Sequence, residues 1–270
     1  MLRLICFGSG SSGNCYYLCN EDENEAILID AGVGIRRLRK YARENEFDFS
    51  NIKGLLITHD HADHIRSAGV FTQEFNIPAY TTDNIHRAIA SNTNHLKTID
   101  PANTATVSVG AGFAIGSFRI TAFPIPHDST ENVGYEIRVG DKTFTIMTDV
   151  GMPTDPIKEH IRRANYLVIE ANYDEEMLRN GPYPHHLKER ITRGTGHLSN
   201  VQTAHLLLEN IHPGLTHVWL CHLSQENNHP ELARKTIEYH MKNFGIIPGV
   251  DFSLDIFRRN MPTGPFVLPV

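Results

Sequence analysis

One segment constrains this sequence more than any other: the apolar run 54–58 leads directly into the pattern His-Asp-His-Ala-Asp-His. The run is typical of a buried strand. Side chains alternate along an extended backbone, so His59 and His61 point to the same side. If the chain then turns into a helix, Asp63 and His64 lie in its first turn and face the same cavity. Imidazole and carboxylate donors suit Zn²⁺, Mn²⁺ or Fe²⁺, so the segment predicts a metal site rather than a solvated turn.

Further ligands are expected at the ends of other strands. The chain holds 16 histidines among its 270 residues, a high count that points to metal or proton chemistry. His127, Asp149 and His222 each come directly after an apolar, strand-like run. α/β proteins build their sites at such strand ends. Each residue alone is equally consistent with a structural turn, but together the three would complete a site for two ions.

Short β-rich runs alternate with longer amphipathic stretches, which is the pattern of an α/β protein. The expected strands are 2–7, 16–19, 26–30, 54–58, 118–123, 134–139, 143–148, 166–170 and 217–222. The expected helices are 35–46, 64–75, 84–91, 155–163, 184–192, 199–209 and 230–243. Turn residues at 20–25, 110–116 and 140–141 indicate hairpins, so a mixed sheet or two-sheet sandwich is favoured over a purely parallel sheet. With no linker-like or repetitive stretch, residues 1–270 are expected to form one domain, with 261–270 as an extended tail.

Charge and cysteine content limit the partners and the compartment. The 25 basic and 31 acidic residues give a net charge of -6, so any polyanion must be held by a local basic patch. Two helical groups are candidates, although such runs are also typical of solvated faces: Arg36, Arg37, Arg39 and Lys40, and Lys188, Arg190 and Arg193. Apolar runs are too short to span a bilayer, so no membrane contact is expected. The four unpaired cysteines predict buried core residues in a cytoplasmic protein.

Together the motifs resemble the metallo-β-lactamase superfamily over nearly the whole chain. Residues 27–32 look like its first motif, 59–64 like its second, and His127, Asp149 and His222 like its third to fifth. The resemblance implies an α/β fold in the form of a four-layer αββα sandwich, two mixed β-sheets flanked by helices, with two metal ions at one edge.

The resemblance also implies a ligand set. Its residues are His59, His61 and His127 for the first ion, Asp63, His64 and His222 for the second, and Asp149 as the bridge. Asp30 would brace the metal loop from behind the ligands. Redox-active di-iron members carry Glu where this chain has His61, so the sequence looks hydrolytic.

Two further motifs favour a nuclease. Glu170 ends a buried strand, and the segment 194–200, which contains His197, precedes a helix with Ser199 as its expected N-cap. Both look like motifs of the transfer-RNA 3′-processing nucleases of the superfamily, where a Glu-His pair assists the leaving group. A hydrogen bond from His197 to the Glu170 carboxylate would raise the pKa of His197 and keep it a proton donor. The alternatives are an ion-paired or capping Glu170 and a structural loop histidine.

The closer resemblance is to the YycJ/WalJ-type group, bacterial 5′-to-3′ exonucleases of double-stranded DNA. It is carried by residues 8–15, by the second motif and by 181–200, where His185 and His186 depart from the usual bulky residues and receive no function. The Ser/Gly loop within 8–14 supplies backbone N–H groups and hydroxyls for a phosphate, although a plain tight loop is the alternative. The expected substrate-binding residues are Ser11, Ser12, Asn14 and Ser199.

The resulting hypothesis is a binuclear, metal-dependent phosphodiester hydrolase with DNA as its substrate. A hydroxide that bridges two Zn²⁺ or Mn²⁺ ions, or Fe²⁺, would attack phosphorus. Asp63 would orient this hydroxide, and His197 with Glu170 would protonate the departing oxygen. One alternative is a phosphodiesterase of small, for instance cyclic, phosphates, which needs no duplex-binding groove. The other is a regulatory metal-binding protein without turnover, which the complete ligand set argues against.

Overall fold

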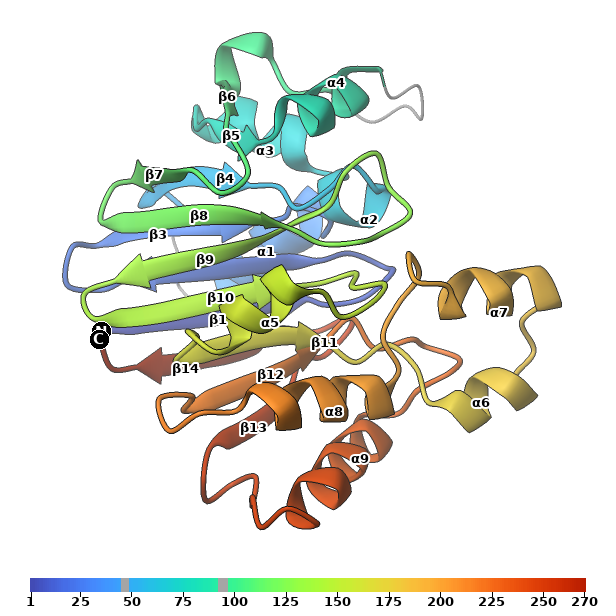
Figure 1. Cartoon of the computed structure of the whole chain (residues 1–270). Helices are drawn as coiled ribbons and strands as arrows, with labels where there is room; N and C mark the ends of the chain where they lie inside the picture. The colour runs from blue at the N-terminus through green and yellow to red at the C-terminus, as the bar shows by residue number, and fades with distance from the viewer. Residues whose placement is uncertain (45–48, 92–96) are drawn as a thin grey trace.

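The computed structural model describes residues 1–44, 49–91 and 97–270, which form two seven-stranded sheets with helices on their outer sides (Figure 1). In sheet order, the first sheet contains β14 (Thr263–Leu268), β1 (Leu2–Gly8), β2 (Cys15–Asn20), β3 (Glu25–Ile29), β4 (Ile52–Leu56), β5 (Ala79–Thr81) and β6 (Thr104–Thr106). The second contains β13 (Ser253–Ile256), β12 (His217–Cys221), β11 (Tyr166–Glu170), β10 (Lys142–Met147), β9 (Val133–Val139), β8 (Phe118–Pro124) and β7 (Gly112–Ile115).

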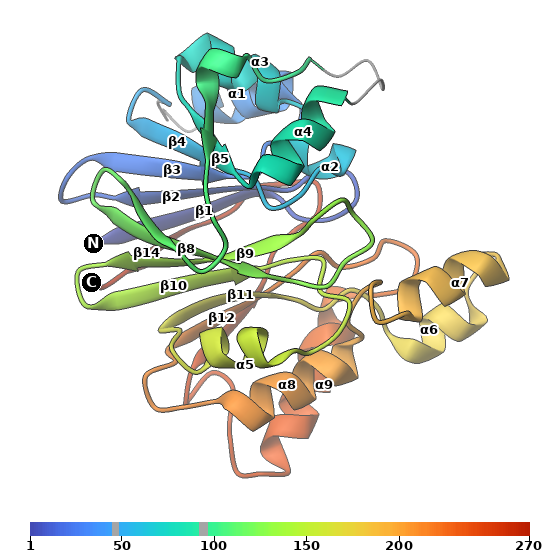
Figure 2. The same cartoon turned by 45° about the horizontal axis from the view of Figure 1, so that its top comes forward.

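Helices complete the four layers. On the side of the first sheet lie α1 (Ile35–Glu44), α3 (Ala68–Phe75) and α4 (Asp83–Ser91), and on the side of the second lie α5 (Asp155–Ile161), α8 (Asn200–Asn210) and α9 (Pro230–Lys242) (Figure 2). The short α2 (Ala62–Ile65) follows β4, η1 (Pro101–Asn103) precedes β6, and α6 (Glu175–Asn180) with α7 (His185–Thr192) projects from the sandwich. The predicted αββα sandwich is therefore confirmed.

The core explains why several strands are apolar throughout. Along β11, Tyr166 and Val168 pack between the sheets, whereas Leu167 and Ile169 pack under the outer helices. Side chains alternate between the two faces of a strand, so a strand covered on both faces needs apolar residues at every position.

Strand direction brings the strand-end residues to one edge of the sandwich. β9 is antiparallel to both β8 and β10, while β10, β11 and β12 are parallel to one another. β8, β10, β11 and β12 therefore run the same way, and their carboxyl ends meet at one edge of the second sheet. This edge holds the loops with the predicted ligands.

The strands that the sequence predicts are confirmed, with ends shifted by at most two residues, as in β4, which covers Ile52–Leu56 instead of 54–58. β5, β6, β7 and β13 were not predicted, because runs of three or four residues show no clear periodicity. Within the hairpin expected at 110–116, residues 112–115 are themselves strand β7.

The expected extended tail is in fact part of a sheet. Residues 263–268 form β14, which pairs antiparallel with β1. This strand was not predicted because of Pro265 and Gly264, since proline is excluded from central strands. β14 lies at the edge of its sheet, where a missing N–H is tolerated.

The helix expected at 64–75 is broken into α2 and α3. Ser67 interrupts it by donating from its backbone N to the Ala31 carbonyl and from Oγ to the Val33 carbonyl. These bonds tie the segment to the loop after β3. Helix α6, which was not predicted, is capped by Asp174, whose side chain accepts from two backbone N–H groups. Residues 45 and 46 of the helix expected at 35–46 lie outside the described residues.

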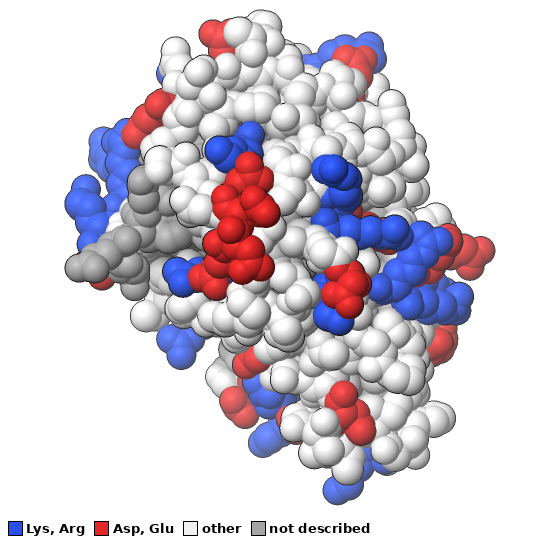
Figure 3. Space-filling view, turned by 90° about the vertical axis from the view of Figure 1, so that its left-hand side faces the viewer, with Lys and Arg blue, Asp and Glu red and all other residues white. Residues whose placement is uncertain are grey.

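The end of the sandwich opposite the ligand loops carries both acidic and basic side chains. A strip of acidic side chains crosses its surface, with basic side chains on either side (Figure 3). The β2–β3 turn lies at this end, where Glu21 pairs with Arg3 and Asp22 pairs with the amino terminus. In the described part of the chain, no helix has the length and apolar character needed to cross a bilayer.

A buried ion cluster ties β9 to α5. Glu136 is 3% exposed and accepts hydrogen bonds from His160 Nδ1 at 2.8 Å and from Arg138 Nε at 3.0 Å. The hydrogen bond from His160 holds the pKa of Glu136 below its usual 4.5, although burial opposes this shift. Because the folded-state pKa is lowered, the carboxylate contributes stability above pH 4.5, and this contribution is lost as the pH falls through the folded-state value.

Glu136→Gln is therefore expected to lower the free energy of unfolding by about 1.5–3 kcal/mol at pH 7. The deficit should shrink below about pH 4.5, because the wild-type carboxylate is then also neutralised. Urea unfolding at neutral and acidic pH measures both values. Glu159→Gln, which removes only an exposed partner of Arg163, is the control and should change stability by less than about 0.5 kcal/mol. An equal Glu136→Gln deficit at both pH values would contradict this role.

Candidate metal centre

All seven predicted ligands lie together where the strands end. His59 and His61 follow β4, Asp63 and His64 belong to α2, and the remaining three follow strands of the second sheet, namely His127, Asp149 and His222. Within each of three groups, the possible ligand atoms lie within 4.8 Å of one another: His59, His61 and His127; Asp63, His64 and His222; His59, His64 and Asp149. The first two groups contain the residues that the family resemblance implies for the two ions, and the third combines residues of both. A fourth group contains Asp149, Glu170, His197 and His222.

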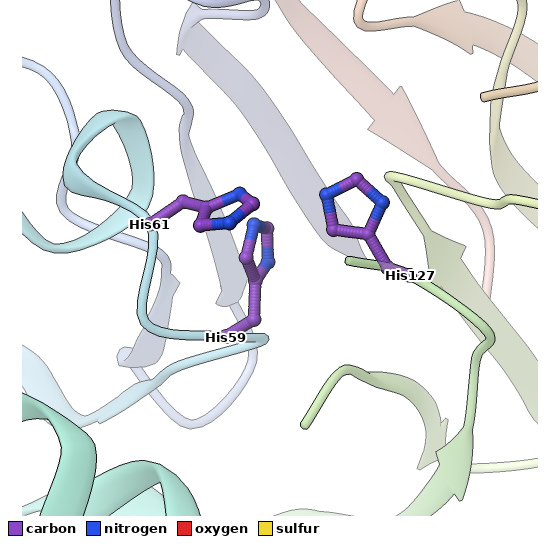
Figure 4. Close-up of side chains that lie close together, drawn as sticks. All are labelled: His59, His61 and His127. Carbon is purple, nitrogen blue, oxygen red and sulfur yellow. The ribbon is translucent and has the colours of Figure 1, made fainter. Parts of the chain in front are cut away.

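The first group joins the two sheets. Its histidines converge, with His59 and His61 on the loop after β4 and His127 on the facing loop after β8 (Figure 4). The ring centroids are 4.7 Å apart for His59 and His61, 5.2 Å for His59 and His127, and 5.1 Å for His61 and His127. Three imidazoles at this spacing can hold one ion.

The second group shares a carboxylate with the first. Asp63 Oδ2 lies 3.6 Å from His64 Nε2 and 3.5 Å from His222 Nε2. Asp149 reaches both groups: its Oδ1 lies 3.7 Å from His127 Nε2 and 3.5 Å from His222 Nε2, and its Oδ2 lies 3.2 Å from His64 Nε2. Asp149 therefore occupies the position of a bridging ligand.

Hydrogen bonds behind the ligands orient the imidazoles. His64 Nδ1 lies 2.7 Å from Asp30 Oδ2, His127 Nδ1 lies 3.1 Å from the Gly196 carbonyl, and His59 Nδ1 lies 3.0 Å from Thr58 Oγ1. Each bond occupies Nδ1 and turns Nε2 towards the cluster, the usual arrangement of metal-binding histidines. Nε2 of His64 also lies 2.9 Å from Asn14 Nδ2. Asp30 also accepts from the backbone N of Thr58 at 2.9 Å, as expected for a residue that braces the metal loop.

The donor atoms fit divalent metal ions. His59 Nε2 is fully buried and has no hydrogen-bond partner among the described residues, which is costly unless another group binds it. Burial holds the pKa of His59 well below its usual value, so its imidazole is neutral, the form that coordinates metal. A set of five histidine and two aspartate ligands is typical of sites for Zn²⁺ and similar ions.

The charges of the cluster balance one another. Burial opposes ionisation of Asp149, but the imidazoles of His222 and His64 hold the pKa of this carboxyl well below its usual range. Conversely, burial disfavours a charged His222, yet Asp149 raises its pKa to about 10. The folded chain therefore presents ionised carboxylates to a cation, and binding would release protons from the histidines.

Three of these residues have a strained backbone. Asp30, Asp149 and His222 have φ values of 55°, 57° and 54°, in the left-handed region that side chains other than glycine rarely adopt. Such strain costs about 1–3 kcal/mol for each residue and is concentrated at functional sites. Each residue ends or follows a strand, and the left-handed turn aims its side chain into the cluster.

The Ser/Gly loop supports the centre instead of only lining it. Asn14 is fully buried, its Nδ2 lies 2.9 Å from His64 Nε2, and its backbone N donates to the Asp63 carbonyl. The close contact with Asp63 also requires Gly32, because a Cβ there would lie 1.6 Å from the Asp63 carbonyl oxygen. Substrate contact by Asn14 was therefore a wrong prediction, since the side chain is out of reach.

The prediction that Ser199 binds the substrate is also corrected. Ser199 is fully buried and caps α8: its Oγ accepts from the backbone N of Gln202, and its own backbone N donates to Gln202 Oε1. The N-cap prediction is confirmed, but this hydroxyl has no access to a substrate. Ser11 is exposed, and the half-buried Ser12 donates to Asn260 Oδ1 at 2.6 Å.

Glu170 and His197 form the expected pair beside the ligands. Glu170 is fully buried at the end of β11, and its Oε1 lies 2.8 Å from His197 Nδ1. Its other oxygen accepts from the backbone N of Val150 and of Leu198. Burial lowers the pKa of His197, but Glu170 outweighs this effect and the net shift is upward. His197 Nδ1 also lies 3.8 Å from Asp149 Oδ1, so the pair lies next to the bridging position.

Two asparagines with supporting roles were missed by the sequence analysis. Asn172 Nδ2 donates to the His222 carbonyl at 2.8 Å and lies 3.2 Å from His222 Nδ1. Asn132 Nδ2 donates to the Asp149 carbonyl at 3.0 Å. Their position at strand ends was a usable signal, but asparagine there is also a common turn residue.

The predicted basic groups are largely paired. Arg39 binds Glu74, Lys40 lies 3.6 Å from Glu44, and Arg37 donates to the Asn260 carbonyl. In the second group, Arg190 binds Asp128, next to His127, and thereby ties α7 to the metal loops. These contacts give most of the basic side chains structural partners.

Asp30→Asn is expected to weaken metal binding by about 10- to 100-fold, because the amide orients His64 less well than the carboxylate does. Zn²⁺ titration against a chromophoric chelator measures the affinity. Asp141→Asn, which alters an exposed carboxylate, should leave it unchanged. An Asp30→Asn protein that binds both ions with wild-type affinity would show that this bond does not support the centre.

Comparison with known proteins agrees with this geometry. Residues 25–218 match the family described as "Beta-lactamase superfamily domain". The chain is 31% identical to "Exodeoxyribonuclease YycJ" of Bacillus anthracis over 263 residues, 97% of each chain. It is 32% identical to "Exodeoxyribonuclease WalJ" of Streptococcus pneumoniae serotype 2 over 246 residues, 91% of this chain and 90% of that one.

Among solved structures, the metallo-β-lactamase fold protein YhfI from Bacillus subtilis aligns with a TM-score of 0.70 and 17% identity, over 98% of this chain and 100% of its own. At this identity the alignment shows a shared fold. The family match, the two relatives and the ligand groups together identify an enzyme of the hydrolase type. The chain belongs to the metallo-β-lactamase superfamily.

Proposed function

We propose that this protein is a binuclear metal-dependent phosphodiester hydrolase that degrades double-stranded DNA from the 5′ end. The observation that carries the proposal is the Glu170–His197 pair beside the two ligand groups, because a held proton donor is what an alkoxide leaving group needs. Relatives named as exodeoxyribonucleases, which align over more than nine-tenths of the chain, support DNA as the substrate.

The residues present would hold two ions, Zn²⁺ or Mn²⁺, with Fe²⁺ as a further possibility. His59, His61 and His127 would bind one, Asp63, His64 and His222 the other, and Asp149 both. When bound, the two ions would activate water and neutralise the charge that develops on the phosphoryl oxygens.

The remaining steps fall to side chains of this chain. Asp63, partly exposed at the rim of the second group, orients the attacking water by accepting its hydrogen bond. His197 is held by Glu170 through Nδ1, so Nε2 can donate a proton to the departing oxygen. Ser11, exposed on the Ser/Gly loop, offers its hydroxyl to a substrate phosphate, whereas Ser12 would first have to release its hydrogen bond to Asn260.

Substrate topology tests the proposal. The metal-loaded protein is incubated with linear duplex, with covalently closed circular duplex, with a cyclic nucleotide and with bis-p-nitrophenyl phosphate. An exonuclease degrades the linear duplex and spares the closed circle. Turnover of only the cyclic nucleotide and the nitrophenyl ester would instead identify a small-molecule phosphodiesterase, and inactivity on all four would favour a regulatory metal-binding protein.

A further inference from the structure

One arginine lies against the Ser/Gly loop. Arg259 belongs to the connection between β13 and β14, and its carbonyl oxygen lies 3.1 Å from the point where Gly8 would carry a Cβ. Its Cγ and Cδ lie 3.1 Å and 3.7 Å from the corresponding point on Gly10. Gly10 has a φ of 146°, in the region that favours glycine, so the loop leaves room for the arginine stem where other residues would place a side chain.

The same loop touches the second ligand group. Ser9 Oγ accepts from the backbone N of His222 at 2.9 Å, and the backbone N of Gly10 donates to Asn14 Oδ1 at 2.8 Å. Asn14 Nδ2 in turn lies 3.3 Å from Asp63 Oδ2. Arg259 therefore packs against the same loop that contacts these ligands.

The guanidinium of Arg259 has no protein acceptor. Its Nη1 is fully buried, and no hydrogen bond or ion pair joins the side chain to any residue that the structure describes. Burial lowers the pKa of Arg259, and the nearby Tyr183 and Glu226 only partly offset this. Other arginines near the loop are satisfied: Arg37 donates to the Asn260 carbonyl, and Arg66 to the Ser12 carbonyl.

A bound anion would provide the hydrogen-bond acceptor that Arg259 Nη1 lacks. Arg259 as a whole is half-buried, but a buried Nη1 without an acceptor is unfavourable, and the planar guanidinium matches phosphate oxygens in a bidentate manner. We propose that Arg259 binds a phosphate group of the nucleic acid next to the scissile phosphodiester, which makes it a positioning residue of the site. This inference rests on the proposed nuclease function and names a contact that holds the substrate in place.

DNA binding tests the inference apart from turnover. Arg259→Gln and Arg259→Lys are made in an Asp63→Ala background, and fluorescence anisotropy with a labelled duplex gives Kd over a range of salt. Arg259→Gln should weaken binding about tenfold, the effect of one lost charge-assisted pair. It should also reduce the slope of log K against log salt by about 0.9, the value for one phosphate contact. Arg259→Lys, which keeps the charge, should retain the slope.

The matched control is Arg258→Gln, which removes the neighbouring exposed charge and should leave Kd within about twofold and the slope within about 0.3. Duplexes with 5′-phosphate and 5′-hydroxyl ends separate two sources of the phosphate. A loss confined to the 5′-phosphate duplex identifies the terminal group, and an equal loss on both identifies the backbone.

Three results would overturn the inference. One is an Arg259→Gln substitution that leaves Kd and the salt slope of the Asp63→Ala parent unchanged, while the same substitution in the active protein still allows duplex cleavage, which leaves the nuclease function intact. Another is an equal loss in Arg258→Gln, which shows that only general charge matters. The third is a lowered Tm of Arg259→Gln with unchanged DNA binding, which marks a structural role. A wild-type chain that neither binds nor cuts DNA would instead refute the proposed function itself.

Discussion

Asp149→Asn is expected to lower kcat/KM by about a thousandfold on every phosphodiester, DNA and bis-p-nitrophenyl phosphate alike. Asp149 lies within 3.7 Å of ligand atoms in both groups, so its loss disturbs both ions at once. Electrophilic stabilisation by bound metal is worth several kcal/mol, and each 1.36 kcal/mol corresponds to a factor of ten in rate. Metal content, measured by atomic emission after gel filtration, should fall together with the activity.

Asp60→Asn is the matched control for this variant. Asp60 lies between two ligands in the second motif, but its carboxylate bonds to the backbone N and to Oγ1 of Thr130, at 3.1 Å and 2.9 Å, and belongs to none of the ligand groups. The Asp60→Asn protein should keep both ions and most of the activity. An Asp149→Asn protein with full metal content and near wild-type rates would contradict the bridging role.

His197→Ala is expected to reduce cleavage of DNA by about 100- to 10,000-fold but hydrolysis of bis-p-nitrophenyl phosphate by less than about tenfold. A sugar oxygen must be protonated as it leaves, whereas nitrophenolate leaves without a proton. Glu170→Gln should show the same dependence on the leaving group with a smaller loss, because the amide still orients His197 but stabilises its charged form less.

The control is His186→Ala, which alters an exposed histidine of α7 and should change neither rate. Steady-state kinetics on both substrates provide the comparison. Equal losses of His197→Ala on DNA and on the nitrophenyl ester would assign His197 to metal binding or substrate positioning instead of proton transfer.

The ligand set could be predicted because its chemistry and its spacing point to the same structure. His59 and His61 are two residues apart at the end of an apolar run, and that run is a buried strand in the structure. His127, Asp149 and His222 were found by the same strand-end rule. The strand directions then bring them together, which no local pattern encodes. The division into two groups came from the family resemblance and agrees with the distances.

The residues that were misassigned depend on tertiary contacts. Asn14 and Ser199 were predicted to contact the substrate because they lie in polar loops, but both are buried. Asn14 packs against His64, which is distant in sequence, and Ser199 caps helix α8. Arg259 carried no sequence signal, because an arginine in a terminal loop is normally solvated. Its buried nitrogen follows only from the packing of the β13–β14 connection against Gly10.

The most direct test of the central claim is a time course on a linear duplex labelled at the 5′ end in one sample and at the 3′ end in another, with the Mn²⁺- or Zn²⁺-loaded protein and with Asp63→Ala. The account predicts immediate release of short 5′-labelled products, with gradual shortening of 3′-labelled strands, and neither in the variant or in EDTA. Intact strands in both samples, while bis-p-nitrophenyl phosphate is still hydrolysed, would contradict a DNA exonuclease.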